Sequence, residues 1–205
     1  MLISYNWLKE YLNLPDSTTA EEVAAKLKAA TVEVEGINNL GKDLGGIVVG
    51  KVLSAEKHPN ADKLKLCQVD VGSEKLQIVC GGSNVVEGML VALAKVGAKV
   101  RWHGEGDLVE LVPTAIRGVD SFGMICAASE VGLDNVFPAK DEKEILDLTQ
   151  YNFKPGEDLA TALGLTDVVF EVDNKSLSNR PDLWGHYGMA REVAVLTNKE
   201  LSDYK

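Results

Sequence analysis

Hydrophobic residues follow helical spacing at the start of the chain. Apolar positions in the first twelve residues recur as on one face of a helix, and Pro15 ends that turn. Thr18 or Thr19, each followed three residues later by a glutamate, predicts a capping box for a helix over 20–30. Alternating apolar residues at 32–37 then indicate a short strand.

The pattern changes near residue 45, where short strand-like runs follow one another. Residues 47–53 form a run with Gly50 near its middle, which predicts a bend or bulge. Residues 64–71 alternate between apolar and polar side chains, as a half-buried strand does. Further apolar runs occupy 76–80, 89–94, 108–112 and 122–126. Because glycine-containing turns separate these runs, they predict five or six strands in a small closed barrel.

Helical spacing returns after residue 150. We expect a short helix over 159–163, a strand over 168–172 and a helix over 185–198. Each flank of the barrel is short for an independent hydrophobic core, so the flanks are predicted to pack together as one split domain. The expected domains are 1–40 and 151–205 for the two halves of the split domain and 41–150 for the inserted barrel. The last five residues suggest a cut chain, so the final range would also hold the start of a further domain.

The charge pattern argues against a strong nucleic-acid binder. The chain has 21 basic and 31 acidic side chains and a formal net charge of -10, whereas a polyanion is normally met by a basic surface. Residues 41–110 are the least acidic part, with nine basic and nine acidic side chains. The basic residues of this part either form a local basic face or belong to a solvated surface of mixed charge. They include Lys57, Lys63, Lys65, Lys95, Lys99 and Arg101.

The cysteines and the chain start bear on the cellular compartment. Cys67, Cys80 and Cys126 form no C-x-x-C pair, and each lies in an apolar run. This predicts buried free thiols in a reducing cytoplasm, without a metal or nucleophilic role. The first residues lack the basic segment and cleavage site of a signal peptide, and no apolar run approaches the roughly 20 residues that span a bilayer. His103 and His186 have no metal-ligand partners at useful spacing.

Three polar segments interrupt the strand-like runs. They are HPNADKL at 58–64, CGGSN at 80–84 and RGVDSFGMIC at 117–126, with SEVGL at 129–133 after them. Turn residues in the first segment leave Lys57, His58, Asn60 and Lys63 free to face a phosphate or a base edge. Each segment taken alone is better explained as a simple turn.

In this order and spacing, the segments resemble the tRNA-binding OB-fold module of aminoacyl-tRNA synthetases and free-standing tRNA-binding proteins. The resemblance covers roughly 45–150. It implies an α+β protein with a five-stranded OB-fold β-barrel inserted into a small split α/β domain. It also implies that residues around one face of the barrel meet tRNA. With the basic residues nearby, the candidate RNA-binding residues are Lys57, His58, Asn60, Lys63, Lys65, Asn84, Arg101, Arg117, Ser121, Met124 and Ser129.

The flanks resemble one member of this group, the bacterial phenylalanine–tRNA ligase beta subunit. The resemblance rests on MLISYNWLKEYL at 1–12, FEVD at 170–173, NRPD at 179–182 and GMARE at 188–192. It implies a cytoplasmic class II ligase that uses ATP and magnesium to attach phenylalanine to tRNA(Phe), with an alpha subunit as partner in an alpha2beta2 assembly. The 205 residues themselves would have no catalytic activity and no cofactor, and would contact neither membrane nor DNA.

Two further expectations limit what the barrel does. Apart from histidines, the only aromatic residues over 41–150 are Trp102, Phe122 and Phe137, and Phe122 lies in a strand pattern that predicts a core position. With few residues to stack on bases, tRNA contact should be weak and directed at backbone or shape. The alternative is a protein–protein assembly module with negligible RNA affinity; a cysteine hydrolase is the least favoured function.

In the NRPD segment, Asp182 is expected to cap the following helix while Arg180 pairs with a carboxylate.

Overall fold

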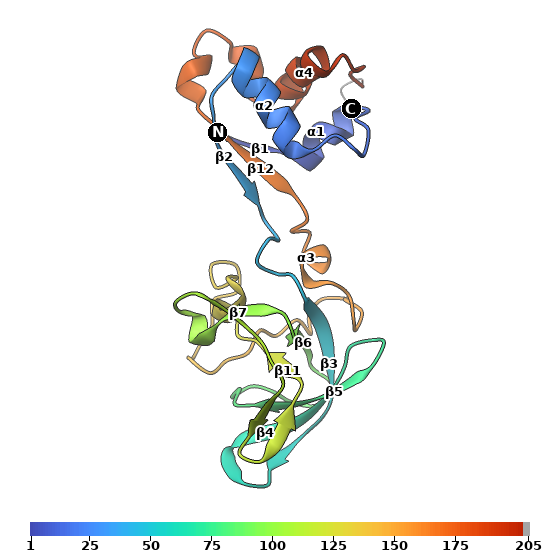
Figure 1. Ribbon diagram of the computed structural model, residues 1–205, viewed down its shortest axis with the longest axis vertical. Helices are drawn as coiled ribbons and strands as arrows, with labels where there is room; N and C mark the ends of the chain where they lie inside the picture. The colour runs from blue at the N-terminus through green and yellow to red at the C-terminus, as the bar shows by residue number, and fades with distance from the viewer. Residues whose placement is uncertain (203–205) are drawn as a thin grey trace. The chain divides into compact units, whose positions relative to one another are not determined.

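The computed structural model describes residues 1–202, which divide into two compact units. Residues 1–40 combine with the chain from Thr166 onward in the first unit, and Gly41–Leu165 form the second (Figure 1). The expected cut at the chain end falls partly on 203–205, which lie outside the described residues. No described helix is both long enough and apolar enough to cross a membrane.

The first unit is built on a three-stranded antiparallel sheet. Its order is β1 (Leu2–Ser4), β12 (Val168–Val172), β2 (Val34–Asn39), so a strand from late in the chain lies between two early ones. Register places Ile3 opposite Phe170 on one side of β12, and Phe170 opposite Ile37 on the other. This pairing makes the early and late segments parts of one sheet.

Helices cover this sheet and supply most of the core of the first unit. They are α1 (Tyr5–Tyr11), α2 (Ala20–Ala30) and α4 (His186–Thr197), with 3-10 turns η3 (Asn174–Leu177) and η4 (Pro181–Leu183) before α4. Thr19 accepts from the Glu22 amide while the Glu22 side chain accepts from the Thr19 amide, which confirms a capping box at α2. Leu8, Leu27, Phe170 and Met189 are fully buried in the shared core.

The NRPD segment is held by ion pairs. Arg180 binds Asp182 through Nε at 3.0 Å and Glu192 through a terminal nitrogen at 3.0 Å, and Arg191 binds Asp182 at 2.8 Å. The expected carboxylate partner of Arg180 is therefore present. The expected cap is wrong, because Gly185 occupies the N-cap position of α4 and Asp182 lies inside η4.

A five-stranded antiparallel barrel sheet forms the second unit, which confirms the α+β class and the OB-type barrel. Its strand order is β11-β6-β3-β4-β5. The strands are β3 (Ile47–His58), β4 (Ala61–Asp70), β5 (Lys75–Cys80), β6 (Leu90–Lys95) and β11 (Gly123–Ile125). The Phe122 amide donates to the Gln77 carbonyl oxygen, and the Val79 amide donates to Ser121 Oγ. These bonds bring the chain entering β11 against β5, so the barrel nearly closes.

Two small hairpins leave the barrel between β6 and β11. One pairs β7 (Lys99–Arg101) with β8 (Leu108–Glu110), and the other pairs β9 (Thr114–Ile116) with β10 (Val119–Ser121). The short 3-10 turns η1 (Trp102–Gly104) and η2 (Ser129–Val131) pack against each other. The hairpins and turns gather near one end of β5, where they build the site described below.

Packing in the barrel accounts for Gly50 and shows that one predicted core residue, Phe122, is exposed. A Cβ on Gly50 would lie 2.6 Å from Val69 Cγ1, so close packing across the barrel requires glycine there. The register shifts between β3 and β4 come later, at Val52–Ser54 and at Lys57–His58. Cys67, Cys80 and Cys126 are buried free thiols, as predicted. The expectation that Phe122 is a core residue is wrong: its side chain is 43% exposed, because the turn into β11 carries it to the surface.

Residues 151–165 belong to the barrel unit. The Gly156 amide donates to the Val49 carbonyl oxygen, and the Val49 amide donates to the carbonyl oxygen of Glu157. Helix α3 (Leu159–Ala162) follows, and Leu159 is fully buried in the barrel core. The unit boundary thus falls after Leu165, whereas the sequence pattern places it after residue 150.

Candidate nucleic-acid interface

Two hairpin tips are joined by the residues of the HPNADKL segment. His58 ends β3, and its Nε2 lies 3.1 Å from the carbonyl oxygen of Ile116. The Asn60 amide donates to His58 Nδ1, and Asn60 Nδ2 donates to the carbonyl oxygen of Arg117. Since Nδ1 accepts, the neutral ring carries its proton on Nε2 and donates it to Ile116. We call His58, Asn60, Ile116 and Arg117 the hairpin junction.

Three exposed cations lie at the hairpin junction or beside it: Arg117 belongs to it, and Lys57 and Lys63 are its neighbours in the sequence. Lys57 precedes His58, Lys63 follows on β4, and Arg117 occupies the turn between β9 and β10 at φ 51. Arg117 and Gly118, at φ 84, are both left-handed, a geometry typical of tight hairpin turns. Within the part of the chain that the structure describes, none of these three cations forms an ion pair. They are therefore available to a phosphate.

Acidic side chains limit the positive charge of this region. The segments 56–65 and 114–121 together contain four basic residues and three acidic ones, a local net charge of +1. The acidic ones, Glu56, Asp62 and Asp120, are exposed. A polyanion would therefore meet a weakly positive patch on an acidic molecule, which favours low affinity.

Two of the candidate RNA-binding residues are used by the fold. The side chain of Asn84 donates to the Ile145 carbonyl oxygen at 3.0 Å and accepts the Ile145 amide at 2.9 Å. Ser121 is 2% exposed, accepts the Val79 amide and donates to the carbonyl oxygen of Gly123. Both side chains satisfy backbone groups that have no strand partner, Asn84 between two loops and Ser121 between β5 and the chain entering β11, which is a structural role.

Other candidates lie apart from the free cations or are already paired. Lys65 donates through Nζ to the Val85 carbonyl oxygen at 2.6 Å, and Arg101 pairs with Asp43 at 3.3 Å. Ser129 begins η2, which packs on η1, and it is half-buried. The structure therefore brings together only part of the predicted set, at the hairpin junction.

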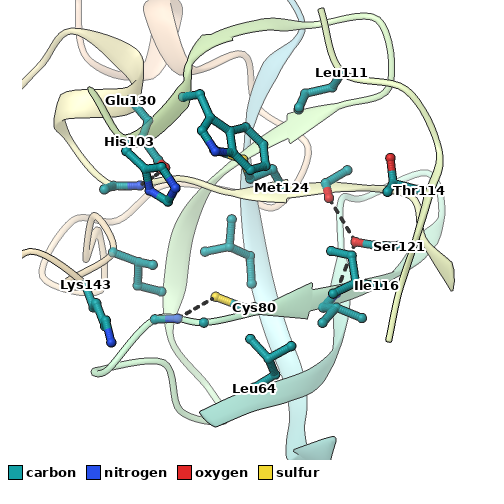
Figure 2. Close-up of a pocket in the computed structure, with 18 of the residues that line it drawn as sticks. Leu64, Cys80, His103, Leu111, Thr114, Ile116, Ser121, Met124, Glu130 and Lys143 are labelled. Carbon is teal, nitrogen blue, oxygen red and sulfur yellow. Dashed lines mark hydrogen bonds between the residues drawn. The ribbon is translucent and has the colours of Figure 1, made fainter. Parts of the chain in front are cut away.

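A cavity of about 550 Å³ opens beside the hairpin junction and shares Ile116 with it. Figure 2 shows Ile116, Ser121 and Thr114 on one side of it, facing Glu130 and His103 on the other. Its lining also includes Met124, the remaining candidate RNA-binding residue. Most of the lining side chains are apolar, with a few polar groups among them, as in many ligand pockets.

Glu130 and Glu142 both line the cavity, and Glu130 is the one held by a backbone amide. Its Oε2 accepts the Ala127 amide at 2.7 Å. Burial raises the pKa of Glu130, and the Ala127 amide and nearby His103 oppose that shift. The desolvated carboxylate remains a strong hydrogen-bond acceptor inside a largely apolar recess.

Burial disfavours the thiolate form of the three cysteines. Burial raises the pKa of Cys67 to about 12 and also raises the pKa of Cys80 and of Cys126. A reactive cysteine instead needs a lowered pKa. Cys80 lines the cavity, and its Sγ accepts a hydrogen bond from the Gly82 amide at 3.2 Å. The arrangement argues against a cysteine hydrolase.

The histidines outside the hairpin junction have other partners. His186 Nε2 accepts the Ser4 amide at 2.9 Å, and burial lowers its pKa. His103 stands edge-on to Trp102, with ring centroids 5.4 Å apart. Across residues 1–202, no group of three or more histidine, cysteine or acidic side chains is placed to hold a metal ion.

The sequence pattern did not predict the cavity or the role of Trp102 in its lining. Trp102 lines the cavity and is 55% exposed. A tryptophan after a strand does not by itself indicate a site, because the cavity forms only when segments distant in the sequence meet. The Gly104-Glu105-Gly106 turn just after it is the one local signal that this segment lies at the surface.

The barrel and its cation-bearing hairpin tips define the class of OB-fold binding modules, which hold oligonucleotides and oligosaccharides on the barrel surface. Residues 47–158 match the family model described as "Putative tRNA binding domain". The chain belongs to this family.

Curated relatives extend the similarity to both flanks. The "Phenylalanine--tRNA ligase beta subunit" of Halalkalibacterium halodurans is 43% identical over 202 residues, which is 98% of this chain and 24% of that protein. The subunit of the same name from Oceanobacillus iheyensis is 42% identical over 207 residues, with the same coverage. The chain thus spans about a quarter of the length of these relatives.

A solved structure is also similar to part of the chain. The MetRS related protein from Pyrococcus horikoshii covers 55% of this chain and 87% of its own, with 22% identity and a TM-score of 0.38. A similarity at this level does not define a shared fold.

Proposed function

We propose that this chain is the tRNA-binding and scaffold portion of a phenylalanine–tRNA ligase beta subunit. Similarity to named beta subunits over 98% of the chain supports this. On this proposal, the complete cytoplasmic enzyme is an alpha2beta2 assembly that attaches phenylalanine to tRNA(Phe) with ATP and magnesium. The 205 residues contribute binding and assembly contacts and carry out no chemical step themselves.

The observation that carries the RNA-binding role is the hairpin junction with its exposed cations. His58 and Asn60 fix the β9–β10 turn against the end of β3, so Lys57, Lys63 and Arg117 are presented by one hydrogen-bonded support. Fixing the backbone that carries the cations lowers the entropy lost when a phosphate is bound. Lysine and arginine contacts to phosphates position an RNA without reading its sequence.

Salt-dependent titration with tRNA(Phe) tests the proposal. Three phosphate contacts predict a slope of log affinity against log salt of about -2 to -3, or a loss of roughly 15- to 65-fold between 50 and 200 mM salt. Absence of binding at 50 mM salt would overturn the RNA-binding role.

A second candidate function is an assembly module with negligible RNA affinity. The observations that favour it are the net charge of -10 and the exposed apolar side chains of the barrel unit, such as Val109 at 49% and Val112 at 63% exposure. Analytical ultracentrifugation of the chain with the alpha subunit separates the two functions. A stable complex together with no tRNA binding at low salt would favour assembly alone.

A further inference from the structure

The cavity beside the hairpin junction has a composition unlike a plain surface depression. Apolar side chains such as Leu64, Leu111 and Met124 line it, and Glu130 and the exposed Lys143 contribute charged groups (Figure 2). The exposed Glu142 adds a second carboxylate to the lining. Its volume of about 550 Å³ lies within the range of sites that bind small ligands. A flat aromatic ligand with polar edges fits such a lining better than a purely aliphatic one.

Trp102 gives the cavity an aromatic surface. Its contact with His103 is T-shaped, with an angle of 74° between the ring planes. An edge-on neighbour covers at most one face of an indole ring, so a further face can receive a planar group. The 55% exposure of the side chain is consistent with an open face.

The position of the cavity links it to the proposed phosphate contacts. Ile116 lines the cavity, and its carbonyl oxygen is bound by His58. Arg117, the next residue, is one of the three exposed cations. A nucleotide whose phosphate meets Arg117 would therefore have its base close to the cavity.

We propose that the cavity receives one unpaired nucleobase of a bound RNA, with the base stacked on Trp102. The proposal rests on the RNA-binding function proposed above and adds the kind of contact made. A base inside a duplex is covered by its neighbours on both faces, so the ligand must be an unpaired base, as in the loops of RNA. Stacking does not select among bases, which fits a site whose one tryptophan offers a stacking surface among mostly apolar side chains.

Stacking on Trp102 would also supply affinity for RNA that the weakly positive surface lacks. A local net charge of +1 supplies little electrostatic attraction, so an apolar contribution is needed if the chain is to hold RNA at physiological salt. One stacked base contributes a factor of roughly 5 to 150 in affinity. Unlike the phosphate contacts, this contribution should depend little on salt.

Fluorescence of Trp102 tests the contact directly. In the 205-residue chain carrying Trp7→Phe and Trp184→Phe, Trp102 is the only tryptophan. We expect tRNA(Phe) to quench its emission, whereas a blunt RNA duplex of the same nucleotide number, which has no unpaired base, should not. In parallel, Trp102→Ala should weaken tRNA(Phe) binding roughly 5- to 150-fold without changing the salt slope. Trp102→Phe should restore much of the loss, and Trp184→Phe, at a residue 56% exposed in the first unit, is the matched control.

The outcomes separate the two proposals. Salt-dependent tRNA binding without quenching, and with unchanged affinity in Trp102→Ala, would overturn the base-binding cavity and leave the phosphate contacts in place. Absence of any tRNA binding by the wild-type chain would overturn both. If Trp102→Ala weakened the association with the alpha subunit but not with tRNA, the cavity would be a protein contact, and the base-binding proposal would be wrong.

Discussion

Replacing His58 separates a structural role from an RNA contact. His58 is 5% exposed and makes two hydrogen bonds of 3.1 Å, to Ile116 and Asn60. At about 0.5–1.5 kcal/mol for each bond, His58→Ala should lower the free energy of unfolding of the barrel by about 1–3 kcal/mol. Asn60 is exposed and Ile116 is partly exposed, so water limits the additional penalty for leaving their backbone groups unpaired. Lys57→Ala, at the neighbouring exposed position, should change stability by less than about 0.5 kcal/mol.

Urea unfolding measures this difference. With Trp7 and Trp184 replaced by phenylalanine, emission from Trp102 reports on the barrel unit alone. For a slope of about 2 kcal/mol per molar urea, His58→Ala should lower the unfolding midpoint by roughly 0.5–1.5 M. Weaker tRNA binding should accompany the loss of stability, because the variant releases the β9–β10 turn that carries Arg117.

The opposite pattern would refute the reasoning. If His58→Ala unfolded at the wild-type midpoint and still lost its tRNA affinity, the ring would be a direct RNA contact. The hydrogen bonds at the hairpin junction would then contribute little to the fold.

Three further predictions concern the packing and the charges. Gly50→Ala should destabilise the barrel by about 1–3 kcal/mol in urea unfolding, because the added Cβ would lie 2.6 Å from Val69 Cγ1; a stable variant would contradict the close packing. The pKa of Cys67 is raised from 9.0 to about 12, so the folded state holds its proton longer than the unfolded state. The stability difference between wild type and Cys67→Ala should therefore shrink as the pH rises above about 9, and a constant difference would argue against a buried thiol. In the first unit, hydrogen bonds from Arg180 lower the pKa of Asp182 from 3.8 to about 2. Their stabilising effect should be present at pH 6 and disappear as the pH falls from about 4 through 2, so Asp182→Asn should be less stable than wild type at pH 6 and equally stable near pH 2.

Local patterns in the sequence were sufficient for the main helices, the long barrel strands and the fold class, but not for short strands such as β1, β9 and β10. The Thr19 capping box, the alternation over 64–71 and the buried cysteines depend on neighbouring residues and on burial, both of which a single sequence encodes. The barrel followed from the number and spacing of its strands. The capping role expected for Asp182 was wrong, because Asp182 lies inside the 3-10 turn η4 and Gly185 is the N-cap residue of α4.

The functional roles within the candidate site depended on contacts between distant segments. His58 and Ile116 are 58 positions apart, and Asn84 and Ile145 are 61 apart, so nothing local shows that these side chains satisfy backbone groups. Phe122 follows a strand-like pattern but turns outward where the chain enters β11. The same positions in a motif can serve the fold or the ligand, and only the hydrogen-bond partners distinguish the two.

The central claim, that the exposed cations at the hairpin junction bind tRNA, is tested most directly by comparing salt slopes. Two variants each lose three positive charges: Lys57→Ala with Lys63→Ala and Arg117→Ala, and a matched control with Lys51→Ala, Lys75→Ala and Lys99→Ala at exposed positions elsewhere on the barrel. We predict that the first variant loses most of the slope of about -2 to -3 in titrations with tRNA(Phe), while the control keeps it. Equal slopes for the two variants would contradict the claim.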